Sequence, residues 1–211
     1  MNFFSQYLML AISTVVAENL LFSRGLGSDE IIRVIAKPKE FMLFGGLLTF
    51  FTTTSSIMGW LMDVALGRFN ISPMLISQTL RSMIYLLVLC GLYYLSVRLL
   101  SKYAKDFYDY ISRALPIAVF NTAVLGAPLL FAKLRVQMLG QAYADNFAGA
   151  IIFGLCVGIG FLFAASLVLE GIRQIDSMDL PDAFRGLPAR FIYIGFLALA
   201  FSGMAGHQSV I

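Results

Sequence analysis

The stretch Asn146–Leu169, with the sequence NFAGAIIFGLCVGIGFLFAASLVL, contains 24 residues and no charged side chain. An α-helix rises about 1.5 Å per residue, so about 20 apolar residues cross the hydrocarbon core of a bilayer, which is roughly 30 Å thick. The stretch also lacks the polar face that a helix of a soluble protein presents to water. It therefore predicts a transmembrane helix.

Five further segments have the same character, and each is long enough to cross a bilayer. They are residues 1–22, Phe41–Met62, the uncharged stretch between Arg81 and Arg98, Ala114–Ala132, and Phe191–Ile211. The first lacks the basic start and the cleavage site of a signal peptide, so we interpret it as a retained helix. We predict an all-α, polytopic membrane protein with six transmembrane helices.

The overall composition excludes the soluble classes. Of the 211 residues, 59% are hydrophobic and 13% are charged, and the mean hydropathy is +0.84. A soluble domain is about 45–50% apolar and about 25% charged. An ordinary soluble enzyme, a secreted disulfide scaffold and a disordered chain are therefore excluded, and the lipid bilayer is the expected environment.

Basic residues predict the orientation of the six helices. Positive loops stay in the cytoplasm. The loops between helices one and two, three and four, and five and six carry eleven basic residues, whereas the opposite side carries four, namely Arg68, Arg81, Lys133 and Arg135. We expect both termini outside, in a cell inner (cytoplasmic) membrane.

The charged segment Ser101–Asp109 divides the six helices into three plus three. We predict a single membrane domain over residues 1–211, with repeat one at 1–100 and repeat two at 101–211. Because each half has an odd number of helices, two related halves must be inverted relative to each other. Inverted repeats place a functional site near the midplane, where helices are interrupted.

Each half has an asparagine in its first helix and a glycine after it. The first half has Glu18 and Asn19 followed by Gly27, and the second has Asn121 and Thr122 followed by Gly126. We expect interruptions in helices one and four, with Gly126 and Pro128 breaking the hydrogen bonding of helix four. The asparagines either bond neighbouring helices as packing contacts or belong to a midplane site, and both interpretations remain open.

Other polar and small residues have simpler interpretations. Gly154-x-x-x-Gly158 and Gly45-Gly46 favour close helix packing. The hydroxyls of the run 52–56 (TTTSS) can bond backward to carbonyls, with a coordinating role as the alternative. Glu18 is an ionisable group near a span and thus a functional candidate, with an ion pair to Arg24 as the alternative. Asp63 and Glu170 are expected at helix ends, solvated.

Several kinds of chemistry are excluded by the residues available. His207 is the single histidine, so the chain holds no histidine triad or multi-histidine metal site. Cys90 and Cys156 lie inside different predicted spans without CxxC spacing, so they are interpreted as small apolar residues. No phosphate-binding loop and no basic nucleic-acid surface is present.

The motifs resemble those of the Rnf/Nqr integral-membrane subunit family. Residues 121–126 (NTAVLG) are similar to the family signature NCAVLG, and residues 181–188 (PDAFRGLP) look like a second family motif. Glu18-Asn19 followed by Leu26-Gly27 resembles the first-half motif, and Gly158–Phe161 and Gly195–Gly203 also resemble the family. The outward termini resemble the RnfA/NqrE type.

The resemblance implies two inverted three-helix repeats and a role in a multi-subunit complex. Such complexes translocate ions and pass electrons between ferredoxin or quinone and NAD. The family works as paired subunits, so the resemblance also implies a homologous partner of opposite orientation, with other Rnf/Nqr-type subunits. In the electron-carrying members, cysteines of the paired subunits hold a [2Fe–2S] cluster.

This sequence departs from the family at the cluster cysteines. Thr122 stands at the second-half cysteine position, and the first-half position falls at Ser28 or Asp29. Neither a threonine hydroxyl nor these residues replace a thiolate as a cluster ligand. We therefore expect no metal site and no cofactor bound by this chain alone, and a [2Fe–2S] cluster is not expected.

Three functions follow as hypotheses. The first is a membrane subunit of an Rnf/Nqr-type ion-translocating electron-transport complex, acting as scaffold or ion-pathway element. Under it the chain is at most a non-catalytic subunit of a redox-driven translocase. The second is a diverged paralogue that transports a small solute or ion, with its binding site at Asn19 and Asn121. The third is a purely structural membrane partner.

Overall fold

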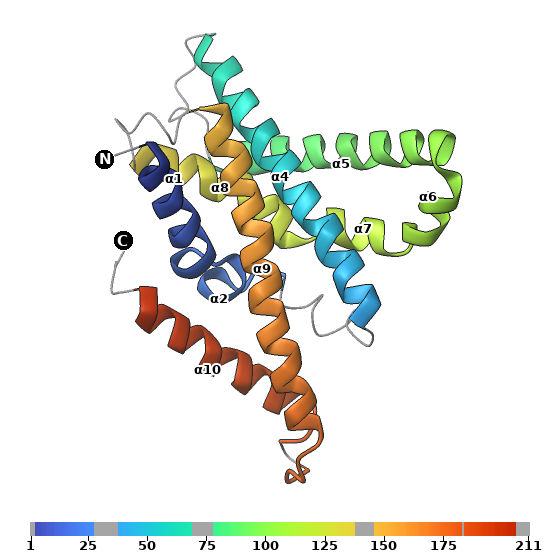
Figure 1. Cartoon of the computed structure of the whole chain (residues 1–211), viewed down its shortest axis with the longest axis vertical. Coiled ribbons are helices and arrows are strands. Elements are labelled where there is room, and N and C mark those ends of the chain that lie inside the picture. Colours follow the sequence, from blue (N-terminus) through green and yellow to red (C-terminus); the bar gives the residue numbers. More distant parts are fainter. Residues whose placement is uncertain (1–2, 28–37, 69–77, 138–145, 183, 206–211) are drawn as a thin grey trace.

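The computed structural model describes residues 3–27, 38–68, 78–137, 146–182 and 184–205, and every regular element in these ranges is helical (Figure 1). Ser28, Asp29 and His207 lie outside the described residues. The elements in chain order are α1 (Phe3–Ile12), a π-helical turn (Ser13–Ala17), α2 (Leu20–Arg24), α4 (Pro38–Arg68), α5 (Gln78–Tyr103), α6 (Lys105–Ile111), α7 (Ala114–Val119), α8 (Thr122–Gln137), α9 (Phe147–Asp176) and α10 (Leu187–Ala205).

Four stretches of helix are long and apolar enough to cross a membrane: Phe41–Leu66, Thr79–Tyr103, Ala114–Leu134 and Phe147–Asp176. They coincide with the second to fifth segments expected from the sequence. The sixth segment forms α10, whose apolar part Leu187–Gly203 is shorter. The first segment is divided into α1 and α2 and is therefore too short, as a single helix, to meet the same criterion.

The centre of the fold is the antiparallel crossing of α4 and α9 (Figure 1). A Cβ built on Gly154 would lie 2.5 Å from the Thr53 Cα, and one on Gly158 would lie 2.6 Å from the Thr49 Cα. Any larger residue would therefore push the two backbones apart, as expected for small residues at a helix crossing. The close packing predicted for Gly154 and Gly158 is observed.

Gly45 and Gly46 differ, although they were expected to act alike. A Cβ on Gly45 would overlap the Leu162 side chain of α9, whereas a Cβ on Gly46 meets nothing within 4 Å. Adjacent helical residues point about 100° apart, so only one of the two can face α9.

The hydroxyl run on α4 bonds backward, as its sequence indicated. Thr53 Oγ1 donates to the Thr49 carbonyl at 2.7 Å, and Thr54 Oγ1 donates to the Phe50 carbonyl at 2.8 Å. Thr52 also reaches another helix, because its Oγ1 lies 3.1 Å from the Gly154 carbonyl oxygen of α9. The run thus joins α4 to α9 at their crossing.

The expected interruption at Gly126 and Pro128 is wrong in position. Helix α8 continues through Pro128, and the break lies earlier, at Phe120–Asn121. Proline removes the donor for the carbonyl four residues before it, which is that of Val124. Ser55 Oγ of α4 donates to this Val124 carbonyl at 3.1 Å. A neighbouring helix therefore satisfies the freed carbonyl, and α8 does not have to break.

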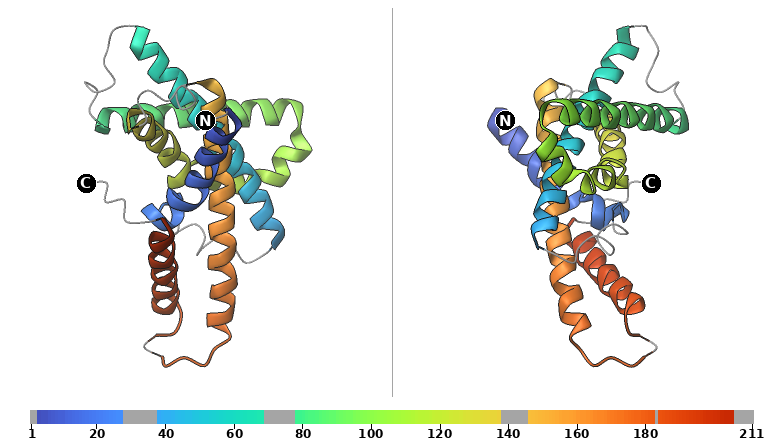
Figure 2. Two further views of the ribbon diagram at one scale, coloured as in Figure 1. Left: turned by 60° about the vertical axis from the view of Figure 1, so that its left-hand side comes forward. Right: turned by 90° about the vertical axis from the view of Figure 1, so that its right-hand side faces the viewer.

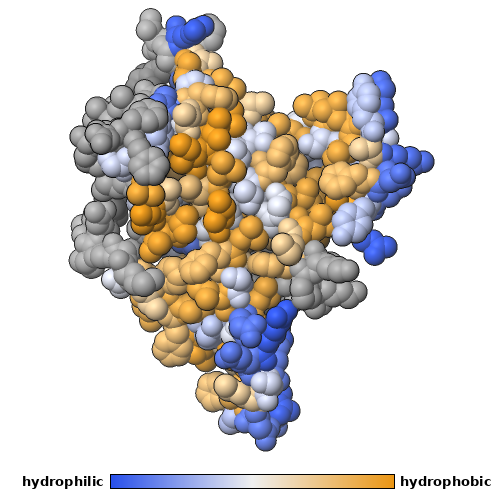
Figure 3. All heavy atoms as spheres, in the orientation of Figure 1, coloured by the Kyte–Doolittle hydropathy of each residue, from blue (hydrophilic) through white to orange (hydrophobic). Residues whose placement is uncertain are grey.

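Helix α5 is the least buried of the four candidate spans: 17% of its most apolar window is buried, against 39% or more in the others. It runs across the direction of α9, and the chain then turns back through α6 and α7 (Figures 1 and 2). Figure 3 shows apolar side chains over most of the visible surface, with hydrophilic groups gathered toward the ends of the molecule. This distribution fits helices that lie in a lipid environment.

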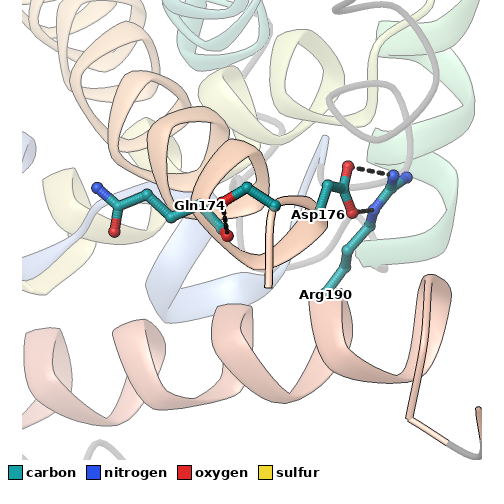
Figure 4. Close-up of polar contacts among 4 residues, drawn as sticks. Gln174, Asp176 and Arg190 are labelled. Carbon is teal, nitrogen blue, oxygen red and sulfur yellow. Dashed lines mark hydrogen bonds and ion pairs between the residues drawn. The ribbon is translucent and has the colours of Figure 1, made fainter. Parts of the chain in front are cut away.

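The link between α9 and α10 is held by charge. Arg190 donates to Asp176 with its Nε at 3.3 Å and its Nη2 at 2.6 Å (Figure 4). Beside this pair, the Gln174 carbonyl at the end of α9 accepts from Ser177 Oγ at 2.6 Å. Tyr193 of α10 covers Gly171 of α9. The C-terminal helix is thereby fixed alongside the end of α9 (Figure 2).

Candidate functional site

Asn19 lies at the first helix break and satisfies the backbone on both sides of it. Its Oδ1 accepts from the N–H of Leu21 at 3.1 Å and of Phe22 at 3.4 Å, which caps α2. Its Nδ2 donates to the Val15 carbonyl and to the Gly160 carbonyl of α9, each at 2.9 Å. The side chain is 2% exposed. One asparagine thus joins α1, α2 and α9.

Asn121 occupies the corresponding place between α7 and α8. It is fully buried, and its Oδ1 accepts from the Ala123 N–H at 2.7 Å, which caps α8. Unlike Asn19, its amide nitrogen has no hydrogen-bond partner among the described residues. The two breaks are therefore alike in capping and different in what the amide N–H groups do.

The chain after α2 returns to the second break. Gly25 ends α2 in the left-handed conformation, with φ of 68°, and Leu26 N–H donates to the Leu20 carbonyl at 3.0 Å, closing the turn. This turn directs Leu26 over Gly126, where a Cβ would lie 2.5 Å from the Leu26 Cδ1. Gly126 therefore serves packing between the halves and not helix breaking.

Gly27 brings the two breaks into direct contact. Its N–H donates to Thr122 Oγ1 at 2.8 Å. Its φ is 80°, and a Cβ on it would lie 2.5 Å from the Phe161 Cε2 and 2.9 Å from the Asn121 Oδ1. Both the backbone conformation and the space require glycine here. The sequence motifs of the two halves thus meet at one place.

Glu18 points away from this contact. Its carboxylate lies 3.2 Å from Arg24 Nη2, and the two side chains are 27% and 38% exposed. This is the ion pair that the sequence left as the alternative for Glu18. At this exposure the pair contributes little to stability.

The residues present do not fit an iron–sulfur cluster. Thr122 offers a hydroxyl where a thiolate is required, and this hydroxyl accepts the Gly27 N–H. Cys90 is exposed on α5 and Cys156 lies on α9, so neither stands at the breaks. Among the described residues, no group of three or more histidine, cysteine or acidic side chains could hold a metal ion. Asp29 lies outside this part of the chain.

One buried pair was missed by the sequence interpretation. Asp63, expected to be solvated at a helix end, has a side chain only 8% exposed, and its Oδ1 lies 3.8 Å from the Nη2 of Arg81 on α5. The expectation was wrong because α5 packs against the end of α4. Arg81 was counted only as a loop charge, and its position opposite an acid across a short connection was the available signal. Glu170, by contrast, is exposed as expected.

These features define a helical multi-pass membrane protein whose first and fourth segments are broken at capping asparagines that lie against each other. The family model described as "Rnf-Nqr subunit, membrane protein" matches residues 7–208, and the chain belongs to this family. The resemblance stated from the motifs is confirmed.

Similar proteins extend over nearly the whole chain. A protein of Erwinia tasmaniensis, named as the RnfA-type subunit of an ion-translocating oxidoreductase complex, is 30% identical over 203 residues, covering 96% of this chain and 97% of the relative. The proteins of the same name from an Azoarcus species and from Aliivibrio fischeri are 29% and 28% identical, with the same coverage of both chains. The similarity therefore includes both helix breaks.

Proposed function

We propose that this chain is an integral-membrane subunit of an Rnf/Nqr-type ion-translocating electron-transport complex, acting as scaffold or ion-pathway element without its own iron–sulfur cluster. The relatives are named as subunits of an ion-translocating oxidoreductase complex. The observation that carries the proposal is the contact between the two breaks, where Gly27 N–H meets the Thr122 hydroxyl. It keeps the family's paired-break architecture with a hydrogen bond where the electron-carrying members hold iron.

The proposal includes six membrane spans in two inverted repeats, over residues 1–100 and 101–211. Asn19 and Asn121, both helix caps, are 102 positions apart (121 minus 19). Thr52 and Gly154, whose side chain and carbonyl are bonded, are also 102 apart. The same shift converts the Gly45–Leu162 contact into a Phe147–Trp60 contact, and these two rings lie 5.7 Å apart. Contacts that repeat at one sequence shift support a two-fold relation between the halves.

The proposed setting is the inner membrane, with both termini outside and a homologous membrane subunit of opposite orientation as partner. Eleven basic residues on one set of loops against four on the other support this orientation. The largely exposed apolar surface of α5 leaves room for a partner within the membrane.

Purification through a tag on this chain tests the assembly. From native membranes in a mild detergent, we expect a homologous membrane subunit together with flavin- and ferredoxin-domain subunits, in constant ratio across a sizing column. A tagged, unrelated six-span protein from the same membranes serves as the control. Recovery of the chain alone, or only with copies of itself, would contradict the proposal.

A transporter remains the second candidate, because the buried amide nitrogen of Asn121 has no partner among the described residues. Such a donor at a broken helix could bind a solute. Under this hypothesis Asn121→Ala abolishes flux into proteoliposomes without unfolding the chain, whereas under the subunit hypothesis the reconstituted chain shows no flux of its own.

A further inference from the structure

A charged pair is buried between α4 and α5, away from the helix breaks. The Asp63 carboxylate and the Arg81 guanidinium lie 3.8 Å apart, with side chains 8% and 12% exposed. Asp63 lies within the candidate span Phe41–Leu66 and Arg81 within Thr79–Tyr103. Ionisable groups inside membrane spans are costly to bury and mark ion pathways more often than packing sites.

The pair ends a polar seam along α4. Ser56, Gly59 and Asp63 are three and four positions apart, so they share one face of the helix. The Ser56 hydroxyl is fully buried and has no hydrogen-bond partner among the described residues. Tyr85, one turn after Arg81 and 3% exposed, packs against this face at Gly59. From Ser56 to Asp63 the seam is about 10 Å long.

Gly59 is the point where three helices meet on this seam. A Cβ on it would lie 2.8 Å from the Pro128 Cβ of α8 and 3.6 Å from the Tyr85 Cζ of α5. Neighbouring Ser55 bonds to Val124, near the start of α8. The seam therefore leads from the Asp63–Arg81 pair toward the region of the second helix break.

The geometry of the pair allows exchange. Charge-assisted hydrogen bonds between nitrogen and oxygen are about 2.7–2.9 Å long, so 3.8 Å is an ion pair that is not closed. A monovalent cation that took the place of the guanidinium on Asp63 would keep the site neutral, whereas adding a cation beside the intact pair would bury a net charge. Carboxylate and hydroxyl oxygens are the ligands that hard cations prefer.

We propose that Asp63 is an exchange site at which a monovalent alkali cation replaces Arg81, and that the Ser56–Asp63 seam is part of an ion pathway. The inference rests on the proposed function, because an ion pathway has a purpose only in an ion-translocating assembly. It assigns to this chain a cation-binding residue on α4.

Thermal unfolding of the full chain in detergent tests the site, with NaCl, LiCl or KCl compared with choline chloride at equal ionic strength. We expect at least one alkali cation to raise the midpoint of the wild-type chain by about 2–4 °C over choline. Asp63→Asn should lose this difference. Arg81→Gln should enlarge it, because the internal competitor is gone. Glu170→Gln, which removes an exposed ion pair with Arg173, should leave it unchanged.

A wild-type chain that responds equally to choline and to all three alkali cations would overturn the proposal, and so would an Asp63→Asn variant that keeps the response. Should Arg81→Gln fail to fold, the neutral double variant Asp63→Asn/Arg81→Gln buries no charge and must show no response. Assembly with partner subunits without a cation response would refute this inference alone. A cation response in a chain that purifies without partners would refute the proposed function alone.

Discussion

The backbone N–H of Gly27 donates to the hydroxyl of Thr122 at 2.8 Å, which joins residues 95 positions apart in the sequence. Thr122 stands at the family's second-half cysteine position. The contact therefore ties the end of the first broken helix to the start of α8 at the point where the family signature departs from cysteine.

Gly27→Ala should destabilise the chain by about 2–4 kcal/mol, because it adds left-handed strain and a clash with Phe161 and Asn121. Gly186→Ala is the matched control: its φ is 81°, but a Cβ there meets nothing within 4 Å, so only the strain of about 1–2 kcal/mol remains. Thermal unfolding in detergent measures both. Equal losses would show that the space around Gly27 is not limiting.

Thr122→Val should cost about 1–3 kcal/mol, since it leaves the partly buried Gly27 N–H without its acceptor. Thr122→Ser keeps the hydroxyl and should recover most of the loss. The comparison uses the midpoint of unfolding. If valine is tolerated as well as serine, the hydrogen bond does not hold the halves together.

Asn19→Ala should be more damaging than Asn121→Ala. The first removes a cap and two donated bonds, to Val15 and Gly160, at about 2–4 kcal/mol. The second removes a cap bond and an amide that donates to no described residue, at about 1 kcal/mol. The reverse order in unfolding midpoints would contradict the assigned hydrogen bonds.

Ser55 and Pro128 should be coupled. Ser55→Ala should cost about 1–2 kcal/mol because the Val124 carbonyl loses its donor. In a Pro128→Ala background the helix regains an N–H for that carbonyl, and the same serine substitution should become nearly neutral. A double-mutant cycle measures the coupling energy. Additive effects would mean that the serine does not compensate for the proline.

The sequence predicted the helices and the residues at the breaks, because long uncharged runs and matched asparagines are local signals. It misplaced the second break, since Pro128 interrupts a helix only where no neighbour bonds the freed carbonyl, and Ser55 lies 69 positions away along the chain from Val124. It also placed Asp63 in solvent, because burial by Arg81 and α5 is a tertiary effect. Tertiary partners decide such cases, and a single sequence does not reveal them.

The iron content of this chain, separated from any partner subunits, tests the central claim most directly. We expect well below one iron atom per chain and no [2Fe–2S] absorption or EPR signal in the oxidised or dithionite-reduced chain, with both breaks intact. Two iron atoms per chain with the spectrum of a [2Fe–2S] cluster would contradict the account, because Thr122 and Gly27 would then not close the site by hydrogen bonding.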